Sequence, residues 1–144
     1  MKLTIFTDGG ARDNPGPAAI GVVIIQEGQT FKKYSEFIGQ ATNNQAEYQA
    51  VIFAMKKVKL LFGKKKAKDM EIEFMIDSEL VAKHLNHQYK IKEKDLKDLF
   101  IKIWNLMLDF KKIEFNHVLR EKNQQADQLV NQALDAQART QTLL

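Results

Sequence analysis

The sequence predicts an α/β protein with a five-stranded mixed sheet flanked by helices, in the order β-β-β-α-β-α-α-β-α. The first observation is the hydrophobic pattern, which alternates in some segments and repeats at helical spacing in others. The second is size, because 144 residues with 44% apolar side chains can bury one core but are too few for two full-size domains. A β-α-β crossover makes its two strands parallel, so we expect the strand after the first long helix to pair with the first strand at the sheet centre.

Three strands are predicted before the first helix. Residues 2–7 alternate apolar and polar side chains, and we expect this strand to stop at Asp8-Gly9-Gly10. A loop rich in glycine and proline follows. Residues 19–26 are rich in Val and Ile and predict a mostly buried strand, and after a turn over 27–29 a third strand over 31–38 returns antiparallel to it.

A long helix is predicted next. Thr42 and Gln45 have the spacing of a capping box, in which the threonine oxygen accepts an orphan amide and the glutamine reaches back. Gly63 is in the usual position to close the helix. The helix has one expected buried stripe. Its members are Ala46, Ala50, Ala54, Val58 and Leu61.

The second half of the chain predicts two more strands and three helices. A fourth strand spans 70–76, and Ser78 is a good cap for a short helix that ends near Asn86. A long amphipathic helix then follows, with Trp104 on its core-facing stripe or at the edge of that stripe. Residues 113–118 alternate as a fifth strand. The apolar positions of the amphipathic helix are Leu96, Leu99, Phe100, Ile103, Leu106, Met107 and Phe110.

A last helix is expected after Asn123, whose side chain can cap it. We expect the chain from Ala136 to Leu144 to fray. The predicted buried stripe of this helix consists of Ala126, Leu129, Val130, Ala133 and Leu134.

The composition excludes several classes of protein. Without cysteine the chain has no disulfide, no cysteine-ligated zinc, no iron–sulfur cluster and no thiol nucleophile. The longest run of apolar residues and glycine, 18–25, is far shorter than the ~20 residues of a membrane-spanning helix. The start of the chain, residues 1–8, meets a charge before a signal-peptide core could form. We therefore expect a soluble, cytoplasmic protein that does not contact a membrane.

The net charge is +4, and the lysines are unevenly placed. Seven of them fall between Lys56 and Lys68. Such a basic patch suggests a polyanionic partner, although a solvated helix end followed by a loop gives the same pattern. A second group consists of Lys83, Lys90, Lys92, Lys94 and Lys97.

Four acidic residues are predicted to meet at one edge of the sheet. Asp8 and Asp77 follow two strands that we expect to be parallel neighbours, ~4.8 Å apart. Glu47 and Asp127 lie near the starts of two helices, and helix N-termini gather at the same edge. Each acid alone has an ordinary explanation as a turn residue or as a charge that complements a helix dipole.

Together, four carboxylates in one poorly solvated place repel one another unless protons or cations neutralise them. Oxygen ligands without cysteine or paired histidine suit Mg²⁺ or Mn²⁺ better than zinc. Two such ions ~3.5–4 Å apart stabilise the attacking and leaving oxygens of a phosphodiester displacement. The pattern therefore predicts a two-metal site.

These residues resemble the four motifs of ribonuclease H, type 1, in order and spacing. The resemblance runs from about Met1 to Ala138 and implies the ribonuclease H-like fold, with a catalytic domain over 1–138 and a C-terminal tail over 139–144. Of the family, the sequence is most similar to the compact branch without a basic protrusion. The motifs are Thr7-Asp8-Gly9-Gly10 with Asn14-Pro15-Gly16-Pro17, Thr42-Asn43-Asn44-Gln45-Ala46-Glu47, Asp77-Ser78 and Asn123-x-x-Ala126-Asp127.

The resemblance implies an endoribonuclease that cuts the RNA strand of RNA/DNA hybrids and leaves 5′-phosphate and 3′-hydroxyl ends. It implies that Asp8, Glu47, Asp77 and Asp127 are the catalytic acids and hold two Mg²⁺ ions, with Mn²⁺ as a possible substitute. The absence of a long apolar seam favours a monomer.

Substrate recognition follows partly from chemistry. The 2′-hydroxyl of RNA both donates and accepts hydrogen bonds, and the amides of Asn43 and Asn44 do the same. In the family, residues matching these two read the minor groove, and those matching Asn14 and Thr42 seat the sugar-phosphate backbone. Thr42 as a helix cap and Asn14 as a turn former are the alternatives, and both roles can coexist.

Two departures from the family pattern concern its loops. Some relatives carry a loop histidine before the last helix, whereas this chain has only Arg120-Glu121-Lys122 there. We interpret nearby His117 as a structural strand residue, and Glu121 as a candidate that assists metal or product exchange.

The basic, tryptophan-containing protrusion of some relatives is also too short here, and Trp104 does not replace its tryptophan. Hybrid binding then depends on Lys90, Lys92 and Lys94, or is weak.

Two other functions use the same features. Recombinases, transposases and exonucleases place carboxylates on similar sheets, but the pair Asn43-Asn44 and the fourth acid Asp127 favour the ribonuclease. A non-catalytic nucleic-acid-binding module fits the missing loop and protrusion. A pure binder, however, gains nothing from clustered negative charge near phosphates.

Overall fold

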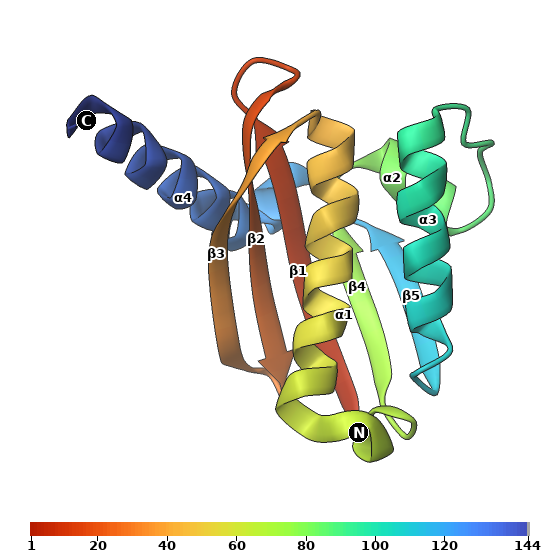
Figure 1. Ribbon diagram of the computed structural model, residues 1–144. Helices are drawn as coiled ribbons and strands as arrows, with labels where there is room; N and C mark the ends of the chain where they lie inside the picture. The colour runs from red at the N-terminus through yellow and green to blue at the C-terminus, as the bar shows by residue number, and fades with distance from the viewer. Residues whose placement is uncertain (144) are drawn as a thin grey trace.

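A computed structural model describes residues 1–143 and contains the predicted mixed sheet (Figure 1). The strand order is β3-β2-β1-β4-β5, and β1 pairs antiparallel with β2 and parallel with β4. The prediction that the first and fourth strands pair at the sheet centre is therefore confirmed. The strands are β1 (Lys2–Ala11), β2 (Gly16–Gln26), β3 (Gln29–Ala41), β4 (Glu71–Ile76) and β5 (Lys112–His117).

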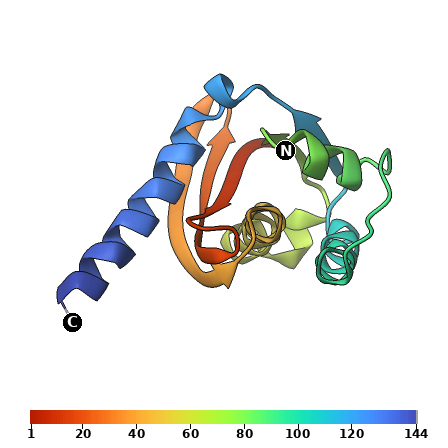
Figure 2. The same cartoon turned by 90° about the horizontal axis from the view of Figure 1, so that it is seen from above.

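Helices cover both faces of the sheet, as the view from above shows (Figure 2). Three of them pack on one face over the main apolar core, and α4 crosses the other face. Within residues 1–143, no helix combines the length and the hydrophobicity that crossing a membrane requires. The helices are α1 (Asn43–Ala67), α2 (Glu79–Leu85), α3 (Lys94–Met107) and α4 (Gln124–Leu143), and a 3-10 turn, η1 (Arg120–Lys122), precedes α4.

The first strand does not stop at its glycines, which corrects the expectation from sequence. β1 continues beside β2 as far as the pair Ala11–Ala18, so the loop is confined to residues 12–15. The physical reason is packing, because a Cβ atom on Gly9 would lie 2.3 Å from the carbonyl carbon of Ala46. The glycine allows β1 to press against α1 and has no role in ending the strand.

The start of α1 agrees with the prediction, and its end differs. Thr42 Oγ1 accepts the Gln45 backbone N–H at 3.1 Å, and Gln45 Oε1 accepts the Thr42 N–H at 2.8 Å, which is the expected capping box. Gly63 interrupts the helix with φ 85°, but a further helical turn continues to Ala67. Leu61 is 38% exposed instead of buried, because Phe62 takes the inward position and packs on Phe31.

Trp104 lies at the edge of the core-facing stripe of α3, where its ring centroid is 6.1 Å from that of Phe100. Leu96, Leu99 and Ile103 are buried as predicted, but Trp104 is 58% exposed because it lies about 100° around the helix from Ile103. Phe110 is also buried, although α3 has already ended at Met107.

The last helix is longer than predicted. Residues 136–143 remain helical instead of fraying, and Leu144 lies outside the described residues. The backbone is supported by Thr140 and Thr142, whose hydroxyls donate to carbonyls four residues earlier. Ala126, Val130, Ala133 and Leu134 are buried as predicted, whereas Leu129 is only partly buried.

Asn123 precedes α4 as predicted, but its side chain is not a helix cap. Its Nδ2 donates to the carbonyl of Thr7 at 2.9 Å, and its Oδ1 has no hydrogen-bond partner among the described residues. The side chain therefore joins the start of α4 to the sheet, where the first strand leaves its parallel pairing.

Candidate active site

The four predicted acids occupy the edge of the sheet at which β4 ends. The parallel pairing of β1 and β4 finishes at Thr7–Ile76, so Asp8 and Asp77 follow adjacent positions. Glu47 lies in the second turn of α1, on one face, and Asp127 lies in the first turn of α4, on the other. Side chains from both strands and from both helical layers thus reach one place.

Three of the acids meet within reach of a single ion. Carboxylate oxygens of Asp8, Glu47 and Asp77 all lie within 4.8 Å of one another. Asp127 is not in this group, but it lines the same cavity of about 370 Å³ and is close enough for its charge to raise the pKa of Asp8. The structure therefore gives a triad with a fourth carboxylate beside it.

Two glycines bring the layers close enough for this arrangement. Gly9 lies against the peptide group that joins Ala46 to Glu47, and a Cβ atom on this glycine would lie only 2.6 Å from the Glu47 nitrogen. On the opposite face, a Cβ on Gly21 would lie 2.1 Å from the Ala126 carbonyl oxygen. Side chains at these positions would move the first turns of α1 and α4 away from the sheet.

Without cations, the buried carboxylates of the site repel one another. Burial, followed by the charge of Asp77, raises the pKa of Asp8 to about 7. Burial, followed by the charge of Asp8, raises the pKa of Glu47 well above its ordinary value. Burial also raises the pKa of Asp77, and hydrogen bonding by Asn123 and the charge of Arg120 oppose that rise. The ionised triad is therefore costly unless positive charge joins it.

The donor set fits a hard divalent cation. Glu47 Oε2 is buried and has no hydrogen-bond partner among the described residues, so a buried carboxylate oxygen is left unsatisfied. A cation ligated by this oxygen would remove that cost, and an all-carboxylate set is the one that Mg²⁺ and Mn²⁺ prefer.

Arg120 is a site residue that the sequence analysis did not single out. It lies in η1, lines the acid cavity and lowers the pKa of Asp77 through its charge. Arg12 also lines the cavity, and its guanidinium pairs with Asp135 at 2.6 Å. The sequence indicated only that Arg120 belongs to the short connection before α4. The 3-10 turn of that connection is what brings the residue to the acids.

His117 lies in the fifth strand, as predicted. It pairs in register with Ile76 at the end of β5, but its side chain is exposed. Its charge also lowers the pKa of Asp77, after the larger effects of Asn123 and Arg120.

The four polar residues proposed to bind the substrate surround the start of α1. Asn14 Oδ1 accepts the Asn43 N–H at 3.0 Å, and Asn43 Oδ1 accepts the Ala11 N–H at 2.8 Å. Thr42 forms the capping box, so these three residues at least hold the loop against the helix. Asn44 lines the acid cavity together with Asn43.

A second hollow adjoins Asn44 and contains two of the three predicted lysines. Lys90 and Lys92 line this cavity of about 520 Å³ with Tyr89, and Asn44 borders it as well as the acid cavity. Lys94 is not part of its lining and pairs with Asp98 at 3.3 Å. The structure thus joins the acids to a basic hollow through one asparagine.

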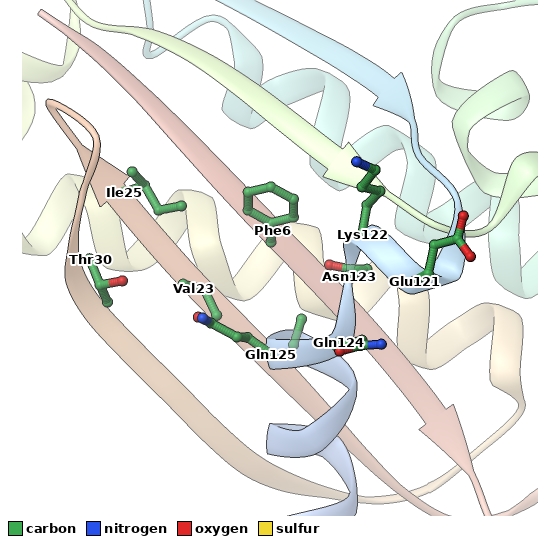
Figure 3. A pocket seen from close by; sticks show the side chains of 10 residues that line it. Phe6, Val23, Ile25, Thr30, Glu121, Lys122, Asn123, Gln124 and Gln125 are labelled. Atoms are coloured by element: carbon green, nitrogen blue, oxygen red, sulfur yellow. The ribbon is translucent and has the colours of Figure 1, made fainter.

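Glu121 lies outside the acid cavity. It lines a different cavity of about 340 Å³, whose floor is formed by Phe6, Val23 and Ile25 and whose edge includes Gln125 (Figure 3). Its proposed role in metal or product exchange stays a prediction, and Glu121 would act from η1 and not from within the triad.

This fold with a carboxylate site at the sheet edge defines the class of ribonuclease H-like domains, and comparisons give the family. The family described as reverse transcriptase-like matches residues 6–133. LC11-RNase H1, isolated from compost by a metagenomic approach and solved in complex with an RNA/DNA hybrid, is 45% identical, with a TM-score of 0.89 over 94% of this chain and 99% of that one. RNase H1 from Halobacterium salinarum is 37% identical, with a TM-score of 0.86 over 94% and 99% of the two chains. The protein belongs to the ribonuclease H1 family.

The curated relatives are longer than this chain. The bifunctional protein Rv2228c of Mycobacterium tuberculosis is 34% identical over 97% of this chain, which spans only 37% of that relative's length. The ribonuclease HI of Halobacterium salinarum is 38% identical over 93% of the chain and 65% of its own length.

Proposed function

We propose that the protein is a metal-dependent endoribonuclease that hydrolyses the RNA strand of RNA/DNA hybrids. The observation that carries this proposal is the triad, whose carboxylate oxygens lie within 4.8 Å of one another and include the unpartnered Oε2 of Glu47. The likeness to LC11-RNase H1, which was solved with an RNA/DNA hybrid, supports the choice of substrate.

The catalytic residues hold the ions and position the scissile phosphate. Asp8, Glu47, Asp77 and Asp127 would hold two Mg²⁺ ions, with Mn²⁺ as a substitute. When bound, such ions would activate a water molecule for attack on the phosphorus and would stabilise the charge on the departing 3′-oxygen, giving 5′-phosphate and 3′-hydroxyl ends. Arg120 lines the same cavity, and its guanidinium would attract the phosphate.

The two strands of the hybrid are distinguished by the polar groups beside the acids. The amides of Asn43 and Asn44 hydrogen-bond 2′-hydroxyls in the minor groove, which DNA lacks. Lys90 and Lys92, in the hollow beyond Asn44, contact phosphates of the DNA strand. The exposed Lys94 adds to the same field.

A single assay tests the function. The protein is incubated with labelled RNA/DNA hybrid, double-stranded RNA and double-stranded DNA in Mg²⁺, Mn²⁺ or EDTA. We expect metal-dependent cleavage of the hybrid's RNA strand alone, which Asp8→Asn lowers at least about a hundredfold. Asp69→Asn changes an exposed aspartate at the other end of the sheet and keeps full activity. Binding without cleavage would instead identify a nucleic-acid-binding module.

We further propose that the protein acts as a monomer in the cytoplasm. Light scattering during size-exclusion chromatography checks the first point, and a mass of twice 16.6 kDa would contradict it. Cell fractionation checks the second.

A further inference from the structure

The seven lysines between Lys56 and Lys68 lie toward the end of α1 that is opposite the acid site, and they have no role in the proposed hydrolysis. Glu47 and Phe62 lie on the same helix, about 22 Å apart at 1.5 Å per residue. Figure 1 shows the two ends of α1 at opposite ends of the sheet. A substrate held at the acids does not explain these lysines.

The charge of the protein is concentrated at this end of α1. Residues 56–69 contain seven lysines and one aspartate, a net charge of +6, whereas the whole chain has +4. Of the seven lysines, only Lys59 forms an ion pair within residues 1–143, with Asp109 at 2.6 Å. Lys64, Lys65 and Lys66 are exposed on the turn after Gly63. This end therefore presents a strong positive potential to solvent.

Aromatic rings lie directly beside these lysines, in two pairs formed by β3 and α1. Phe31 packs against Phe62 with ring centroids 5.7 Å apart, and Phe31 is 40% exposed. Tyr34 packs edge-on against Phe53 at 5.4 Å, and the Lys57 ammonium lies 5.3 Å from both of those ring centroids. We call five lysines of this end, Lys32 and these rings the far-end cluster. Its members are Phe31, Lys32, Tyr34, Phe53, Lys56, Lys57, Phe62, Lys64, Lys65 and Lys66.

We propose that the far-end cluster is a second nucleic-acid contact and that it binds single-stranded nucleic acid. Lysines attract phosphates, and the exposed ring of Phe31 can accept an unpaired base by stacking, which needs no sequence preference. Lys32, whose ammonium lies 5.9 Å from the Phe31 ring centroid, contacts the phosphate next to the stacked base. A duplex, whose bases are already stacked, offers phosphates but no free base face, so the rings favour a single strand.

The far-end cluster binds single-stranded nucleic acid whether or not the acid site cleaves. It also extends the proposed function, because one substrate can contact both sites. The stretch of about 22 Å along α1 corresponds to about seven nucleotides at the 3.4 Å spacing of a stacked strand. A hybrid with a single-stranded extension longer than this contacts both ends of the protein at once. We expect such a substrate to bind more tightly than the blunt hybrid. This last expectation alone rests on the proposed function.

Fluorescence anisotropy with a labelled oligothymidylate of twenty nucleotides, in EDTA, tests the site without the metal centre. We expect wild-type protein to bind with a strong salt dependence, and Lys64→Gln/Lys65→Gln to lower the slope of log K against log salt by about 1.4. The control Lys97→Gln/Lys102→Gln removes two exposed lysines of α3 and leaves the slope unchanged. If the slope fell equally in the two double variants, the effect would come from net charge alone, and the proposal would be overturned.

The ring of Phe31 gives a separate test. Phe31→Leu keeps an apolar side chain but removes the stacking surface, and we expect about tenfold weaker binding, whereas Phe31→Trp retains it. Circular dichroism verifies that both variants are folded. Unchanged affinity in the leucine variant overturns the stacking contact.

A parallel arm uses vesicles of phosphatidylcholine with phosphatidylserine. Binding to these vesicles without binding to the oligonucleotide would assign the far-end cluster to a membrane surface and overturn the proposal. Hydrolysis of blunt hybrid, measured on the same preparations, reports on the proposed function independently.

Discussion

Gly9 on β1 lies against the peptide nitrogen of Glu47 on α1, so closely that a Cβ on the glycine would be 2.6 Å from that nitrogen. The contact sets the separation of the strand that carries Asp8 from the helix that carries Glu47. The site therefore depends on the absence of a side chain as much as on the presence of the acids.

Gly9→Ala is expected to separate these two carboxylates. The added methyl group also meets the Ala46 carbonyl at 2.3 Å, and backbone on both sides cannot yield without shifting α1. We expect Mg²⁺-dependent cleavage to fall at least about a hundredfold, with Tm lowered by a few degrees. Gly10→Ala is the control, because its methyl group would meet nothing closer than Val130 Cγ1 at 3.7 Å. Equal activity of the two variants would show that the contact does not set the geometry.

Asp8→Asn is expected to stabilise the metal-free protein while it abolishes cleavage. The folded-state pKa of Asp8 is about 7 against an ordinary 3.8, so between these pH values the folded chain holds a proton that the unfolded chain has lost. The free energy of unfolding therefore falls as pH rises from about 4 to 7, and the asparagine removes this loss. At pH 8 in EDTA we expect Tm to rise by about 5 °C, with little change near pH 4. Thermal unfolding across that pH range measures it, and a lower Tm of the variant at pH 8 would contradict it.

Asn123→Ala tests the link between the sheet and α4. The variant loses the 2.9 Å bond to the Thr7 carbonyl, so we expect about 1–2 kcal/mol of destabilisation and at least tenfold lower activity as Asp127 moves. Asn86→Ala removes the same kind of bond, from Nδ2 to the Phe115 carbonyl at 2.9 Å, away from the acids. Its stability should fall similarly while its specific activity stays unchanged. Similar activity losses in both would assign the effect to stability alone.

Lys90→Gln/Lys92→Gln tests the basic hollow. If both lysines contact phosphates of a blunt-ended hybrid, the slope of log K against log salt falls by nearly two, at about 0.9 per contact. Binding is measured in Ca²⁺ or EDTA to prevent cleavage. Lys64→Gln/Lys65→Gln, at the other end of the sheet, leaves this slope unchanged. An unaltered slope in the first variant removes these lysines from the interface.

The convergence of the acids was predictable because it depends on local patterns and one topological rule. The alternation of residues 2–7 and the apolar strand before Asp77 identify two strands, and the helix between them makes those strands parallel neighbours. The capping box fixes where α1 starts, and hence which of its turns carries Glu47.

What sequence did not reveal depends on contacts between layers. Gly9 and Gly10 look alike as strand-ending residues, and only the packing of α1 shows that the first is required. Asn123 has the composition of a cap, but the buried carbonyl of Thr7 competes for its amide. Arg120 belongs to a 3-10 turn whose direction no periodicity predicts.

The acids come from three layers, with Glu47 on a helix above the sheet, Asp127 on a helix below it and the two remaining acids between them. Divalent ions bound there would connect the sheet to the helices on both of its faces. Hydrogen exchange at the first turns of α1 and α4, which do not touch the same face, should therefore slow together when Mg²⁺ is added. Bound metal would then stabilise the packing of both helices on the sheet as well as take part in the chemistry.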